Sequence, residues 1–107
     1  MASYYKNAKV DLTSTNVTTL YTAPAATTAV FKSLLVADDS GSTSTITVTL
    51  TDSASAVFVV FNVKATSANT TVELLTEPLV VLESEILKVT AANANRLHVV
   101  GSYVEIS

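Results

Sequence analysis

The residues best able to do acid–base chemistry are few and are spread along the chain. The one histidine, His98, lies in the apolar stretch RLHVVGSYVEI, where strand alternation places it on the face opposite Leu97 and Val99. Acidic residues gather only in polar, turn-like stretches: Asp38 with Asp39, Asp52, and Glu83 with Glu85. General acid–base catalysis uses titratable groups held together in a cleft, whereas neighbouring carboxylates in a turn are normally solvated. We therefore expect none of these side chains to be catalytic.

Metal binding and nucleophilic catalysis have no stronger candidates. A calcium site could use oxygen ligands from Asp38, Asp39 and the DSGS turn, since calcium takes six or more oxygens. The spacing of these residues matches no closed loop site. The chain has no cysteine and no HExxH, GxSxG or phosphate-binding glycine-rich motif. No serine or threonine stands in a recognisable His/Asp arrangement that would activate it. The sequence therefore predicts a protein that is not an enzyme, with no catalytic residues, metal or cofactor.

Composition describes one small, apolar, weakly charged domain. The 107 residues are 49% hydrophobic and 14% charged, against about 25% charged residues in an average domain. The net charge of −3 is scattered, which argues against a nucleic-acid surface because such surfaces carry a basic stripe. No apolar run approaches the ~20 residues of a spanning helix, and the start, MASYYKNAKVDL, lacks the apolar segment of a signal peptide. We expect no nucleic-acid partner and no membrane partner.

Strand-forming residues dominate the pattern. The chain contains 17 threonines among many valines, and β-branched side chains suit a pleated sheet better than a helix. Strands are expected at 8–12, 17–23, 28–37, 44–51, 56–63, 70–75, 79–83, 86–91 and 97–106. A helix over 77–94 is the weaker alternative, because Pro78 and several β-branched residues oppose it. Short strands joined by polar turns predict an all-β fold, a single antiparallel β-sandwich (Ig-like or jelly-roll-like) of about eight to nine strands.

Two neighbouring stretches of this pattern differ in kind. Residues 44–51 alternate strictly between threonine and apolar side chains, whereas residues 56–63 are apolar on both faces. Alternation predicts a core containing Leu34, Val36, Ile46, Val48, Leu50, Val57, Val59, Phe61, Val89 and Val99. Phe58 and Val60 then lie on the second face of 56–63, which is either covered by a loop or the N-terminal segment, or forms a subunit interface. Both interpretations place this strand inside a sheet and not at its edge.

The N-terminal segment combines two large rings with positive charge. Tyr4 and Tyr5 are adjacent, and Lys6 and Lys9 follow in a chain that is otherwise acidic. We expect residues 1–9 to form an arm that leaves the sandwich of residues 10–107 and lies against a neighbouring subunit, since aromatic rings supply contact area at low entropic cost. The alternative is that one tyrosine fastens the segment to its own domain, over Phe58. The candidate interface residues are Tyr4, Tyr5, Lys6, Phe58 and Val60.

A family resemblance covers residues 17–106. The stretches VTTLYTAPAATTAVFKSLLVADDSGSTSTITVTLTDS and VELLTEPLVVLESEILKVTAANANRLHVVGSYVEI resemble small β-sandwich virion proteins of tailed bacteriophages, marine phages in particular. The shared features are an early LYTAPA, the Asn-Ala-Asn turn at 93–95 and the closing SYVEI. Where relatives often carry a glycine-containing turn, this chain has Ser84-Glu85.

The resemblance implies a non-enzymatic structural protein of the virion, assembled in the host cytoplasm. The leading expectation is a capsid decoration (cement) protein that binds the lattice of the major capsid protein. A tail, baseplate or fibre subunit, and a stand-alone β-sandwich binding module, are the alternatives. The expected partners are the major capsid protein or other virion subunits, together with further copies of the chain in a homo-oligomer, a trimer or a dimer. The trimer is preferred by analogy with other decoration proteins.

Overall fold

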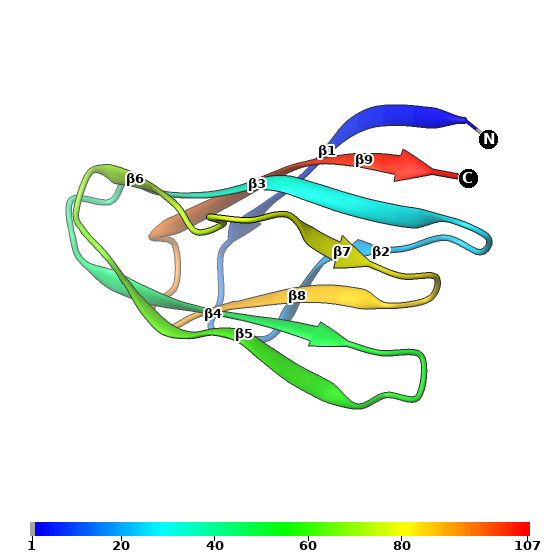
Figure 1. The fold of residues 1–107 in the computed structure, drawn as a ribbon. Coiled ribbons are helices and arrows are strands. Elements are labelled where there is room, and N and C mark those ends of the chain that lie inside the picture. Colours follow the sequence, from blue (N-terminus) through cyan, green and yellow to red (C-terminus); the bar gives the residue numbers. More distant parts are fainter. Residues whose placement is uncertain (1) are drawn as a thin grey trace.

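Two antiparallel β-sheets hold nearly all of the regular structure of the protein (Figure 1). The computed structural model describes residues 2–107. The five-stranded sheet runs in the order β1 (Ser3–Leu12), β9 (Leu97–Ile106), β3 (Thr28–Asp38) and β6 (Thr70–Glu73), with β7 (Leu79–Val81) also paired to β3. The four-stranded sheet runs β2 (Thr18–Thr22), β8 (Ile86–Ala91), β4 (Ser44–Thr51) and β5 (Val57–Thr66). With no helix anywhere in residues 2–107, the predicted all-β antiparallel sandwich is confirmed.

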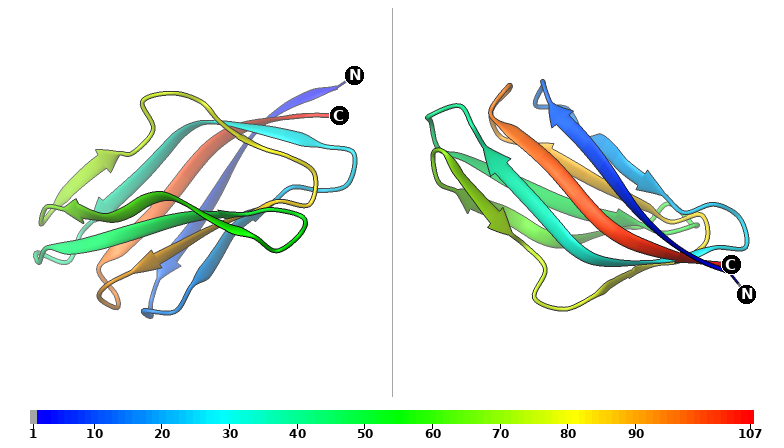
Figure 2. Two further views of the ribbon diagram at one scale, coloured as in Figure 1. Left: turned by 60° about the horizontal axis from the view of Figure 1, so that its bottom comes forward. Right: turned by 90° about the horizontal axis from the view of Figure 1, so that it is seen from above.

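The core fills the space between the two sheets, which face each other in Figure 2. Six of the residues predicted to be buried have no exposed surface: Leu34, Val36, Ile46, Val48, Val89 and Val99. Leu50 and Phe61 are partly buried and pack against this core. Alternation therefore predicts correctly the inner faces of β4, β8 and β9.

A β-bulge in β3 places Phe31 and Leu34 on the same face. Simple alternation puts these two side chains on opposite faces, yet both are fully buried, because the register with β9 shifts between Phe31 and Ser33. The Glu73 carboxylate holds the bulge by accepting hydrogen bonds from Ser33 Oγ at 2.5 Å and from the backbone N–H of Leu34 at 2.7 Å. Burial disfavours ionisation of Glu73, but these bonds and others from nearby backbone amides outweigh it and lower its pKa.

Strand β5 contradicts the sequence prediction in its position. It is the edge strand of the four-stranded sheet, whereas both interpretations of its apolar sequence required a position inside a sheet. Val57 and Val59, predicted to lie in the core, are 60% and 58% exposed. The physical reason is twofold: the register with β4 shifts on either side of Val48, which breaks the alternation of β5, and an edge strand has only one neighbour to cover it.

The N-terminal segment also differs from the expected arm. Residues 3–12 form the single strand β1, which pairs antiparallel with β9 from Ser3↔Ile106 to Leu12↔Leu97. The backbone pairing runs without interruption through Lys9 and Val10, so the predicted boundary between an arm at 1–9 and a sandwich at 10–107 is not a structural one. The reason is that β9 would otherwise leave one edge unpaired, and β1 satisfies its backbone groups. Met1, the first residue of the predicted arm, lies outside the described residues.

Candidate functional site

The five predicted interface residues lie in three different places. Tyr4 and Lys6 pair with Glu105 and Tyr103 and so share the inner side of β1, whereas Tyr5 lies on its outer side. Phe58 and Val60 lie on β5, at the edge of the other sheet. Since β1 lies beside β2, and β5 lies beside β3 and β6, the two strands occupy opposite margins of the sandwich (Figures 1 and 2). The five residues therefore do not form one surface.

The edge strand β5 presents a group of exposed apolar side chains, which we call the β5 edge: Val57, Phe58, Val59 and Val63. Their side chains are between 56% and 60% exposed. No charged residue occurs from Ser53 to Val63. Val60, by contrast, is partly buried against the protein's own core, so of the two predicted residues on this strand only Phe58 is open to a partner.

Val63 adds backbone strain to the β5 edge. Its φ is +48°, in the left-handed region that costs an L-residue roughly 1–2 kcal/mol and is a genuine outlier for a β-branched residue. Its N–H donates to Thr47 Oγ1 at 3.1 Å, which holds the backbone at the second bulge of β5. The Val63 side chain remains 59% exposed, so burial within the protomer does not offset the strain.

Lys6 is engaged by its own fold through the carboxylate of Glu105. Lys6 Nζ lies 2.7 Å from Glu105 Oε1, and the Tyr21 hydroxyl donates to Glu105 Oε2 at 2.6 Å. These bonds from Lys6 and Tyr21 lower the pKa of the nearly buried Glu105, and the same carboxylate raises the pKa of Lys6. Burial, together with the bond to Glu105, raises the pKa of Tyr21. Lys6, predicted from the sequence as an interface residue, thus binds β1 to β9 of its own sandwich.

The outer face of the five-stranded sheet carries an apolar row that crosses four strands. Tyr5 pairs with Val104, Val104 with Val30, and Val30 with Val80, so the four side chains share one face. Tyr5 is 86% and Val80 45% exposed, and Val30 and Val104 are partly exposed. We call these four residues the outer row. Of the predicted interface residues, Tyr5 belongs to this surface.

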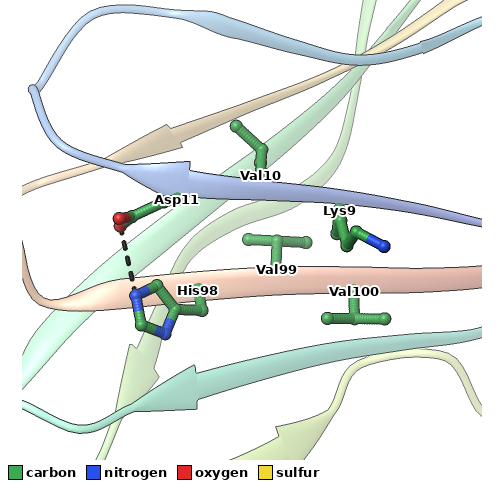
Figure 3. Close-up of a pocket in the computed structure, with 6 residues that line it drawn as sticks. All are labelled: Lys9, Val10, Asp11, His98, Val99 and Val100. Carbon is green, nitrogen blue, oxygen red and sulfur yellow. Dashed lines mark ion pairs between the residues drawn. The ribbon is translucent and has the colours of Figure 1, made fainter.

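His98 lies on the same outer face, at the opposite end of β9 from the outer row. Its Nε2 is 3.2 Å from Asp11 Oδ1 and its Nδ1 is 3.8 Å from Asp39 Oδ2. Figure 3 shows the shallow hollow beside the pair, where His98 and Asp11 meet across β9 and β1. Among the side-chain hydrogen bonds of residues 2–107, none joins His98 to a serine or threonine hydroxyl. The pair ties β1 to β9 at the surface.

The acidic residues do not converge on a common point. Within the described part of the chain, no group of three or more His, Cys, Asp or Glu side chains is placed to hold a metal ion. Asp38, considered above for calcium, is 2% exposed, and its Oδ1 accepts hydrogen bonds from the backbone N–H and the hydroxyl of Ser40. The carboxylate therefore shapes the turn after β3.

The sequence matches no protein-family model and no curated protein. Across residues 2–107 there is no helix long and apolar enough to cross a membrane.

Two features of these surfaces were missed by sequence reasoning. The outer row depends on which strands are neighbours, and β7 and β1 are far apart in sequence, so alternation alone could not reveal it. The Glu105 contacts did leave a signal: Leu97, Val99, Gly101 and Tyr103 alternate inward along 97–106, and Glu105 continues that inward series. A glutamate at a core position is rarely buried unless it is paired, which predicts a cation or hydroxyl nearby.

Proposed function

We propose that this protein is a non-enzymatic structural protein of a tailed-phage virion, and that it decorates the capsid by binding the lattice of the major capsid protein. The observation that carries the proposal is the outer row, a band of apolar side chains across the outer face of the five-stranded sheet. Large contiguous apolar patches on a protein surface usually mark a site of interaction. The resemblance of residues 17–106 to small phage virion proteins supplies the kind of partner.

The outer row suits attachment to a repeating surface. The ring of Tyr5 is almost fully exposed, and Val80 extends the contact on the same face as far as β7. Exposed Lys32 lies near this row on β3. The rest of the face is mixed in charge, with Lys9 and Asp11 on β1 and Glu73 on β6. A small contact of this kind is weak alone, but many copies linked to one another on a shell bind with high avidity.

The copy number of the protein in purified virions tests the location. A decoration protein should be present in hundreds of copies per particle, measured by quantitative mass spectrometry against the major capsid protein. A few to some dozens of copies would instead indicate a tail, baseplate or fibre subunit. Absence from washed particles would leave a stand-alone binding module and would overturn the proposal.

Substitutions in the outer row test the surface. Tyr5→Ser and Val80→Lys should each reduce binding to capsids that lack the protein by about tenfold or more, because each removes apolar contact or adds an unpaired charge. Val17→Lys is the matched control, since Val17 is 63% exposed but lies outside the outer row. Equal binding of all three variants in a co-sedimentation assay would exclude the outer row as the docking surface.

A further inference from the structure

We infer that β5 pairs with β5 of a second copy about a two-fold axis at Phe58, which joins two four-stranded sheets into one continuous sheet of eight strands. This deepens the proposed assembly role by naming the contact between copies. The place of this contact in a virion rests on the proposed function. The pairing itself does not, because it can be measured on the isolated protein.

The β5 edge lacks most of the features that protect sheet edges. Natural edge strands avoid pairing through charged side chains, prolines, short length or cover from another element. Strand β5 is ten residues long, and residues 53–63 contain neither a charge nor a proline. Its two bulges are the one protective feature, and both lie beyond Val59. The stretch from Ala56 to Val59 is therefore open to another strand.

The hydrogen-bond alternation in the β4–β5 hairpin shows which backbone groups face outward. Asp52 N–H donates to the carbonyl oxygen of Ala56 at 2.9 Å, and bonded pairs recur at every second residue of an antiparallel ladder. Leu50 and Phe58, which face each other, are then the next bonded pair. The N–H and C=O groups of Val57 and Val59 therefore point away from β4, toward the unpaired edge.

The outward N–H and C=O groups of Val57 and Val59 are complementary to the same groups of a second copy related by a two-fold axis. With the axis at Phe58, Val57 lies opposite Val59 of the second copy, and Val59 lies opposite its Val57, so four backbone hydrogen bonds can form. The two Phe58 side chains become a directly opposed pair on one face, where aromatic pairs stabilise cross-strand contacts. The 56% of Phe58 that is exposed in the protomer would be covered by its own symmetry mate.

The charges nearest to this stretch stay outside the contact. Asp52 lies on the β4 side of the hairpin, where its N–H donates to the carbonyl oxygen of Ala56, and Lys64 lies beyond both bulges. No charge within residues 56–59 therefore opposes pairing with a second copy.

The pairing closes on itself and is small. The two-fold contact occupies the β5 edge of both copies, so it yields a closed dimer and not a growing fibre. Only a few residues on each side of the axis take part before the bulges, which places the contact at the small, weak end of protein interfaces. We expect association of the isolated protein at micromolar or higher concentrations, strengthened when copies are held on one surface.

A single engineered cysteine tests the axis, because the chain has no cysteine of its own. In a non-bonded antiparallel pair the two Cα atoms lie about 4.5 Å apart, within the range of a disulfide. Phe58→Cys should therefore form a covalent dimer on mild oxidation. Val57→Cys, whose two copies would be diagonal neighbours about 7–8 Å apart, should crosslink at least tenfold more slowly. Val17→Cys, exposed elsewhere, is the control for random collision.

Sedimentation velocity over a concentration series gives the second readout, which does not depend on Phe58. The unmodified protein should pass from monomer to dimer, and Val59→Pro, which removes an outward N–H, should remain a monomer with its circular dichroism unchanged. If proline disturbs the fold, Val59→Lys serves the same purpose through charge. A monomer at all concentrations, a trimer, open-ended aggregates, or equal crosslinking at 57 and 58 would each overturn the inference. None of these outcomes alters the copy number in virions, so the two proposals fail separately.

Discussion

The two outermost long strands of the sandwich, β1 and β5, present their edges in opposite ways. Strand β1 carries Lys6, Lys9 and Asp11, and its side chains contact β9 in two places, through the Lys6–Glu105 ion pair and between Asp11 and His98. Strand β5 has four exposed apolar side chains and no charge before Lys64. Charged residues on an edge discourage strand addition, and their absence permits it. This contrast underlies our proposal that the β5 edge meets a second copy, while Lys6 of β1 stabilises the protomer.

Exposure of side chains alone does not make this distinction. Tyr4 and Phe58 are almost equally exposed, at 55% and 56%, but the strand that carries Tyr4 is paired with β9 along its whole length and anchored through Lys6. Both strands are edge strands that pair with one neighbour, so the charged side chains make the difference between them. Lys6 of β1 is bound by Glu105, whereas the β5 edge has no charged side chain from Val57 to Val63.

Deletion of residues 2–7 should produce the largest change in the protomer. It removes half of β1, exposes the edge of β9 and takes Lys6 away from the nearly buried Glu105. We expect the melting temperature to fall by roughly 10 °C, the shift that about 2 kcal/mol produces in a domain of this size. Thermal denaturation followed by circular dichroism measures it. An unchanged melting temperature would restore the arm that the sequence predicts.

Glu105→Gln should give the next largest effect. The variant keeps the shape of the side chain but loses the charge that Lys6 and Tyr21 both contact, so we expect a loss of about 1–2 kcal/mol at pH 7 by urea denaturation. Glu77→Gln, at an exposed position, is the matched control and should change stability by less than about 0.5 kcal/mol. Equal effects at both positions would contradict the anchoring role of Glu105.

The same variant should show a defined dependence on pH. Because the pKa of Glu105 is lower in the folded protein than in the unfolded chain, its stabilising contribution is complete above the ordinary glutamate value of about 4.3 and is lost as the pH falls through the folded pKa. The difference in stability between the unmodified protein and Glu105→Gln should therefore be constant from pH 6 to 8 and shrink below about pH 4. A difference that grows on acidification would contradict this sign.

Val63→Gly should have the smallest effect on the protomer, and of the opposite sign. Glycine adopts positive φ without the steric cost borne by valine, while its greater flexibility in the unfolded chain offsets part of the gain. We expect a net stabilisation of about 0.5 kcal/mol or less in chemical denaturation at low protein concentration. Destabilisation by more than about 1 kcal/mol would mean that the Val63 side chain already has a role within the protomer.

Much of this fold is predictable from local pattern. Wherever strands keep regular alternation, as in β4 and β8, sequence predicts which side chains are buried, including Ile46, Val48 and Val89. Prediction fails where a residue is inserted into the ladder. The bulges of β3 and β5 each reverse the alternation from that point on, and they depend on partners distant in sequence, such as Glu73 for the bulge at Ser33.

The candidate surfaces, too, are predictable from local pattern only in part. Sequence singles out Phe58 and Tyr5 because large apolar side chains need a partner, and both are exposed in the protomer. It could not show that they lie on different sheets, since strand order is set by pairing across the whole chain. Nor could it distinguish an edge strand from an inner one by apolar content, because the β5 edge has the sequence of a strand buried on both faces.

Backbone amide hydrogen exchange at Val57 and Val59, measured by NMR in dilute and in concentrated solution, tests the role of β5 most directly. Both amides should exchange rapidly in dilute protein, and their protection should rise at least tenfold in concentrated protein, when the outward N–H groups pair with a second copy. Amides of β9 should be protected equally in both samples, because β1 and β3 already cover that strand. Protection at Val57 and Val59 that does not change with concentration would contradict the assignment of β5 as the edge through which copies meet.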